Sequence, residues 1–141
     1  MDLFDRMLEL ARQGFFCAQI ILIIALEAEG KENPDLVRAL GGLSEGLGFT
    51  TGDACGALTG GCCLISYFAG KGEPDEMEHP AYREMVKAFI DWFREYAEEY
   101  GGTTCQAILA GDPKNRVQRC PGLIQAAFEK CMELLEERGV L

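Results

Sequence analysis

The sequence predicts an all-α fold, a single compact domain that spans residues 1–141. Three observations support this prediction. Apolar residues recur at intervals of three to four, glycines and prolines stand where these periodic segments end, and no segment alternates as a β-strand does. The periodicity indicates about six helices. A chain of this length can bury a core without the help of disulfides.

The first expected helices cover residues 2–13, 15–29 and 34–40, and Asn33 before Pro34 is a suitable N-cap for the third. Residues 41–54 are rich in glycine and lack periodicity, so we expect a shaped loop there. Further helices are expected over residues 55–69, 80–100 and 105–110. The last one is expected to begin at Cys120 and Pro121, with proline at the first helical position.

Two of these helices carry clear apolar stripes, which we expect to form the core. In the helix over residues 80–100 the stripe includes Phe89, Phe93 and Tyr96. The last helix carries a similar stripe that includes Cys131. Cys131 is therefore interpreted as a small buried hydrophobic residue.

The composition excludes several classes of function. The net charge of -10 disfavours nucleic acid and anionic lipid as partners, because both require basic patches. The most apolar run is shorter than the roughly 20 residues that span a bilayer. The N-terminus is acidic where a signal peptide would be basic, so we expect a cytoplasmic protein. Static disulfides are uncommon in that compartment, which favours catalytic, redox or metal-binding roles for the cysteines.

Four of the seven cysteines are expected to open helices: Cys17, Cys55, Cys105 and Cys120. A cysteine in the first turn of a helix lies near unpaired N–H groups and the positive end of the helix dipole, which favour the thiolate. The hypothesis is that these four residues converge on one redox or metal site. We expect the pKa of Cys55 to lie below the free-thiol value of about 8.5, although Asp53 opposes this.

Other motifs give weaker indications. Gly52, Gly56 and Gly60 recur every four residues and predict a strip without side chains. Either a neighbouring helix or a bulky cofactor could approach this strip closely, so Gly56 and Gly60 are candidate cofactor-binding residues. Cys62 and Cys63 are adjacent and would diverge on a helix. The single histidine, His79, is expected to be a cap or loop residue.

Familiar site motifs are missing from the sequence. It contains no C-x-x-C pair, so a zinc ribbon or a thioredoxin-type site is unsupported. It also contains no P-loop and no dinucleotide-binding glycine motif.

With these residues in view, the chain resembles the family of small redox-active proteins named for the cysteine pattern C…GCAxxG…C…C. Its central signature, Cys-Gly-Ala-x-x-Gly, is matched by residues 55–60, and Cys17, Cys105 and Cys120 match the flanking cysteines. The resemblance implies redox activity through these four cysteines, in a bacterial and archaeal group often encoded near transporters. A similar module accompanies iron–sulfur and haem centres in some cytochromes. Covalent haem attachment is excluded here because the chain has no C-x-x-C-H.

Three functions remain open. The first is thiol–disulfide or electron-transfer chemistry, with Cys55 as the attacking thiolate and Cys17, Cys105 or Cys120 as the resolving thiol. The second is a metal or iron–sulfur site held by the same four cysteines. The third is a non-catalytic helical module that binds a transporter. The first would make the protein a thiol-based oxidoreductase whose partner is a redox protein or a small thiol. A homodimer is also expected.

Overall fold

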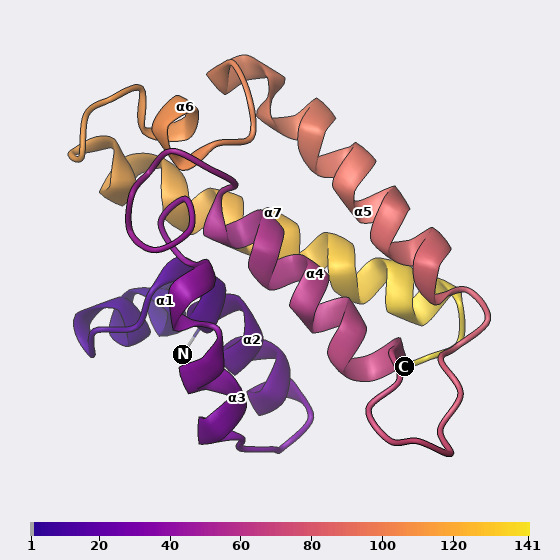
Figure 1. The fold of residues 1–141 in the computed structure, drawn as a ribbon. Helices are drawn as coiled ribbons and strands as arrows, with labels where there is room; N and C mark the ends of the chain where they lie inside the picture. Colours follow the sequence, from indigo (N-terminus) through magenta and orange to yellow (C-terminus); the bar gives the residue numbers. More distant parts are fainter. Residues whose placement is uncertain (1) are drawn as a thin grey trace.

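Two helices, α4 (Gly56–Ala69) and α7 (Asn115–Glu137), form the centre of the fold in a computed structural model that describes residues 2–141 (Figure 1). Helix α2 (Cys17–Ala28) and helix α5 (Tyr82–Tyr96) both pack against α4 and α7. In Figure 1, α2 and α5 lie on opposite sides of α4. The site described below lies where the N-terminal ends of α2 and α4 meet α7.

Shorter elements complete the fold. Helix α1 (Leu3–Arg12) packs against α7 and α2, α3 (Pro34–Ala39) against α2, and α6 (Cys105–Leu109) against α7. Two 3₁₀ turns, η1 (Gly41–Leu43) and η2 (Ala97–Tyr100), follow α3 and α5. Over residues 2–141 there is no β-strand, only an isolated bridge between Ala54 and Thr104. The all-α prediction is confirmed.

The core forms where α4, α5 and α7 meet. Phe89 and Phe93 of α5 are fully buried, which confirms the predicted stripe at these positions. A Cβ atom on Gly61 of α4 would overlap the Phe89 ring and lie 3.2 Å from the Cys131 sulfur. Tyr96, in contrast, is 37% exposed, so its predicted burial is wrong. It stands at the end of α5, where the chain passes into η2.

Gly56 and Gly60 allow α2 to approach α4 closely. A Cβ atom on Gly60 would overlap Ile21 and lie 2.9 Å from the Ala18 Cα atom. A Cβ atom on Gly56 would overlap the sulfur of Cys17. Residues of α2 therefore occupy the space over both glycines, as the helix-packing interpretation expects.

Helix α7 begins at Asn115, earlier than the sequence predicts. The carbonyl of Asp112 accepts the Asn115 N–H at 3.0 Å, so the preceding turn leads directly into the helix. Pro121 lies inside α7 and leaves the Val117 carbonyl without its helical donor. Val117 is 76% exposed, so water can take the place of that donor. The prediction that Cys120 opens a helix is therefore wrong.

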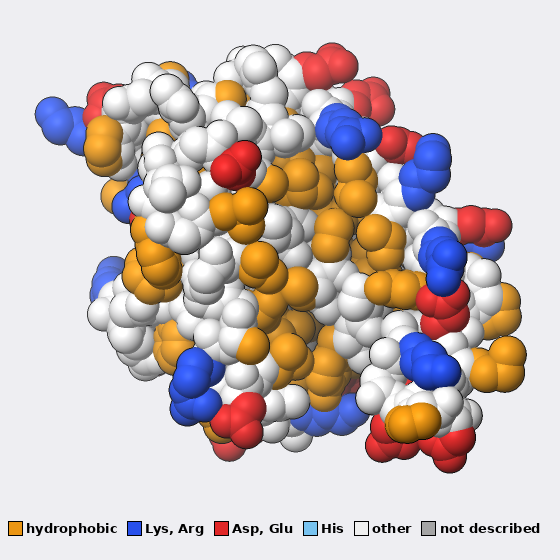
Figure 2. Space-filling model, viewed as in Figure 1, with side chains coloured by type: hydrophobic (Ala, Val, Ile, Leu, Met, Phe, Trp, Pro, Cys, Tyr) orange, Lys and Arg blue, Asp and Glu red, His pale blue; other side chains and the backbone are white. Residues whose placement is uncertain are grey.

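The surface carries a band of apolar side chains. Figure 2 shows them gathered over α4 and between α4 and α5 on the face seen in Figure 1. Leu58 and Cys62 of α4 and Trp92 of α5 are half-buried apolar residues packed against the core. Among residues 2–141, no helix combines the length and apolar character that crossing a membrane requires.

Candidate functional site

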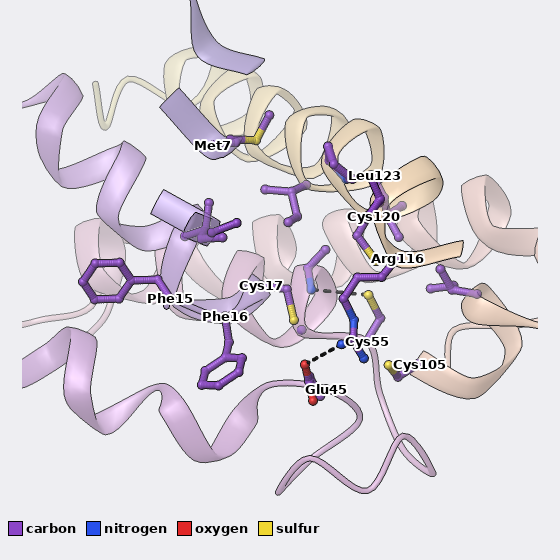
Figure 3. A pocket seen from close by; sticks show the side chains of 18 of the residues that line it. Met7, Phe15, Phe16, Cys17, Glu45, Cys55, Cys105, Arg116, Cys120 and Leu123 are labelled. Atoms are coloured by element: carbon purple, nitrogen blue, oxygen red, sulfur yellow. Dashed lines mark hydrogen bonds and ion pairs between the residues drawn. The ribbon is translucent and has the colours of Figure 1, made fainter. Parts of the chain in front are cut away.

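The four cysteines of the predicted set line one pocket of about 210 Å³ (Figure 3). Its walls come from α1, α2, the start of α4, α6 and the first half of α7. Figure 3 shows the Cys17, Cys55, Cys105 and Cys120 side chains directed into the same space. The structure therefore brings together residues that are separated by more than one hundred positions in the chain.

Hydrogen bonds fix two of these cysteines beside each other. Cys55 donates its N–H to the Thr103 carbonyl at 2.8 Å, and Cys105 donates its N–H to the Asp53 carbonyl at 2.9 Å. These bonds flank the bridge between Ala54 and Thr104. The segment that leads into α4 is thereby tied to the segment that leads into α6, and their cysteines share one wall of the pocket.

Three of the four cysteines lie at the start of a helix, as the sequence predicts. Cys17 is the first residue of α2 and Cys105 is the first residue of α6. Cys55 is the N-cap of α4, and its sulfur accepts the Ala57 N–H at 3.4 Å. Thr104 caps α6 by accepting the Ala107 N–H at 3.0 Å.

The expected low pKa of Cys55 is wrong. Burial raises the pKa of the Cys55 thiol, and a charge on Cys17 raises it further. The N–H groups of Ala57 and Leu58 lower it, but by less than the loss of hydration raises it. The helix N-terminus can be recognised in the sequence. The burial that leaves Cys55 only 5% exposed cannot, because distant residues cause it.

Cys17 interacts electrostatically with the other three thiols. A negative charge on Cys17 raises the pKa of Cys55, of Cys105 and of Cys120, and in each case only burial raises it more. Burial and this charge bring the pKa of Cys120 to about 12. Cys17 itself is only partly buried. Its sulfur occupies the space that a Cβ atom on Gly56, the residue that follows Cys55, would need.

One ion pair crosses the pocket, and sequence reasoning did not find it. Arg116 Nη1 of α7 lies 3.2 Å from Oε1 of Glu45 (Figure 3). The Arg116 charge lowers the pKa of Cys105 and Cys120, and the Glu45 charge raises it. The two residues are distant in sequence, and no local motif marks either of them.

The loop that carries Glu45 has an unusual backbone. Residues 45–49 all have positive φ, from 51° at Glu45 to 75° at Gly46. A left-handed conformation costs non-glycine residues about 1–2 kcal/mol each. Hydrogen bonds hold the turn in place: the Thr51 N–H donates to the Glu45 carbonyl at 2.8 Å, and the Asp53 N–H donates to the Gly46 carbonyl at 3.0 Å. This turn places the Glu45 side chain at the pocket.

The remaining cysteines lie outside the pocket. Cys131 is fully buried and donates its S–H to the Gly61 carbonyl at 3.5 Å, which confirms its predicted place in the core. Burial raises the pKa of Cys62 to about 11 and also raises the pKa of Cys63. His79 accepts the Ala81 N–H through Nδ1 at 3.0 Å, just before α5, as expected of a capping residue.

The four pocket cysteines are also candidate metal ligands. Thiolate sulfurs would suit zinc or an iron–sulfur cluster by their chemistry. Within residues 2–141, however, no group of three or more cysteine, histidine or acidic side chains is arranged to hold a metal ion. The four cysteines share a pocket, but their arrangement here does not fit a metal or cluster site.

A family comparison agrees with this site. The family described as "Putative redox-active protein (C_GCAxxG_C_C)" matches residues 15–134, which is most of the chain. The chain belongs to this family. The match covers all four pocket cysteines of this C_GCAxxG_C_C protein. No curated protein and no solved structure shows a significant match to it.

Proposed function

We propose that this C_GCAxxG_C_C protein is a thiol-based oxidoreductase in which Cys17 is the attacking thiol and Cys55 resolves the mixed disulfide. One observation carries the proposal: four cysteines from four segments line a single pocket. Within this set, a charge on Cys17 raises the pKa of each of the other three thiols. A set of thiols that only packed would have no reason to face a shared cavity.

Accessibility favours Cys17 as the first nucleophile. Thiol–disulfide exchange requires an accessible sulfur, and a thiol buried in apolar surroundings reacts slowly. Cys17 is partly exposed, whereas Cys55 and Cys105 are buried. Cys17 also stands at the first position of α2, beside backbone N–H groups that have no partner within the helix.

The position of the Cys17 sulfur over Gly56, the residue that follows Cys55, favours Cys55 as the resolving thiol. A Cys17 thiolate raises the pKa of Cys55, so the second thiol stays protonated while the first is charged. When Cys17 becomes part of a mixed disulfide, its negative charge disappears. The pKa of Cys55 then falls at the step in which Cys55 must attack. The order of the two steps thus follows from the coupling.

The experiment compares single cysteine variants of the reduced protein. Cys17→Ser should abolish the formation of an internal disulfide. Cys55→Ser should let Cys17 react but leave it as a mixed disulfide. Cys63→Ser is the matched control, because Cys63 is a partly buried cysteine outside the pocket. Peptide mapping of the oxidised wild-type protein identifies the sulfur pair.

Several outcomes would contradict the proposal. An internal disulfide that persists in Cys17→Ser would show that Cys17 is not required. A stoichiometric metal or iron–sulfur chromophore in protein purified without air would favour ligation by the same cysteines. Slow reaction of all pocket thiols together with no metal would favour a binding module.

A further inference from the structure

The part of the chain that the structure describes offers few polar side chains to a ligand in this pocket. Apart from the cysteines and one ion pair, its lining side chains are apolar, and they include Met7, Phe16, Ile20, Val117 and Ile124. A charged ligand that entered would lose its hydration without gaining a free counter-charge. An apolar ligand has no such hydration to lose and would bury its surface against these side chains.

Among residues 2–141, the one cation that lines the pocket is already paired with a carboxylate. Arg116 pairs with Glu45 at 3.2 Å, and both belong to the pocket lining. An anionic ligand would have to displace the Glu45 carboxylate in order to use Arg116. It would also approach a chain whose net charge is -10, which repels anions at low salt. Both effects disfavour small disulfides that carry carboxylates.

The entrance, where lining residues are exposed, carries apolar side chains beside Arg116, whose side chain is 44% exposed. Phe16 is 37% exposed and Val117 is 76% exposed, and both line the pocket. Phe49 extends this surface, because its ring lies 4.8 Å from the ring of Phe16. The volume of about 210 Å³ is below the range of roughly 300–1,000 Å³ that holds drug-sized ligands. The site is therefore suited to a small molecule.

We propose that the oxidant of this site is a small, uncharged disulfide with apolar substituents, which enters over Phe16 and Val117 and meets Cys17. This inference rests on the proposed thiol–disulfide function and specifies its substrate class.

The reaction balances in two exchanges. The Cys17 thiolate attacks one sulfur of the disulfide, forms a mixed disulfide and expels the other half as a thiolate. The Cys55 sulfur, after losing its proton to water, then attacks the Cys17 sulfur and expels the second thiolate. Both thiolates take up protons from solution. The protein dithiol is oxidised by two electrons, and the disulfide is reduced to two thiols.

The test uses two aromatic disulfides that differ in charge. Dithiodipyridine is neutral, whereas dithiobis(nitrobenzoate) carries two carboxylates, and both release a coloured thiol. The rate at Cys17 is the difference between the reduced wild-type protein and Cys17→Ser. Each rate is divided by the rate of the same reagent with urea-unfolded protein. We expect this ratio to favour the neutral reagent by at least about tenfold at low salt.

A pair of lysine variants tests the role of the entrance. Val117→Lys should raise the rate of the anionic reagent several-fold by adding a positive charge at the pocket. Met77→Lys is the matched control, because Met77 is 89% exposed and lies outside the pocket, and it should leave the preference unchanged. An equal effect of both variants would assign the change to overall charge and overturn the role of the entrance.

The outcomes separate the two proposals. If the anionic reagent reacts with the folded protein as well as the neutral one does, the substrate class is wrong. The exchange function still stands in that case, provided that the wild-type protein releases two coloured thiols more per chain than Cys17→Ser does. If the difference is one coloured thiol with either reagent, Cys17 stays as a mixed disulfide, no internal disulfide forms and the proposed function itself fails.

Discussion

Replacing Gly56 by alanine would place a methyl group where the structure has the Cys17 sulfur. The added Cβ atom would overlap Cys17 Sγ and lie 3.0 Å from the backbone nitrogen of Ala18. The backbone nitrogen cannot give way without moving α2. The substitution therefore tests the contact between α2 and α4 and the position of the attacking thiol together.

The magnitude follows from two opposing effects. Overpacking a well-packed contact costs about 1–3 kcal/mol. Alanine in place of glycine stabilises a helix by at most about 1 kcal/mol, and by less at the first position of α4. The expected net loss in the free energy of unfolding is about 1–2 kcal/mol, by the difference of these values. Gly122→Ala in α7 is the control, because a Cβ atom there meets nothing within 4 Å.

Two assays read out this prediction. Urea denaturation should show Gly56→Ala less stable than wild type and Gly122→Ala equally or more stable. Alkylation of Cys17 should also change in rate in Gly56→Ala, because its sulfur must leave its present position. The packing argument is refuted if Gly56→Ala matches Gly122→Ala in stability and leaves the alkylation rate of Cys17 unchanged.

Four further predictions follow. Phe89→Ala should lower the free energy of unfolding by about 3–5 kcal/mol in urea titration, whereas Phe4→Ala, at a residue 42% exposed, should change it far less. Burial raises the pKa of Cys131, so its thiol ionises first in the unfolded chain. Stability should then fall as pH rises above about 8.5, with a shallower slope in Cys131→Ala. At low salt, Glu45→Gln should lower the pKa of Cys105 and Cys120 and so speed their alkylation. Arg116→Gln should raise the pKa of these thiols and slow their alkylation. Light scattering at tens of micromolar should show the expected homodimer, and a monomer would contradict it.

Helix ends could be predicted from the sequence wherever a local hydrogen bond sets them. Asn33 accepts the Leu36 N–H at 3.1 Å before α3, and Thr104 caps α6. Gly70 ends α4, as the sequence indicates. These signals lie within a few residues of the helix end, so one sequence contains all the information that is needed.

Features that depend on distant residues could not be predicted in this way. The pairing of Glu45 with Arg116 requires the left-handed turn of residues 45–49 and the early start of α7. The raised pKa of Cys55 depends on burial by α2, α6 and α7, which the local N-cap position does not reveal. The convergence of the four cysteines was a hypothesis from their similar local contexts. Their shared pocket agrees with it, even though Cys120 lies inside a helix.

The two glycines of the signature Cys-Gly-Ala-x-x-Gly have a structural reason. Gly60 lets α2 lie against α4, because any side chain there would meet Ile21 and the backbone of Ala18. Gly56 leaves the space that the Cys17 sulfur fills. Both glycines thus bring the start of α2 to the cysteine that caps α4. Without them the helices would stand further apart and Cys17 would move away from Cys55. The glycines of the motif therefore serve its cysteine: they hold Cys17 close enough for its charge to raise the pKa of Cys55.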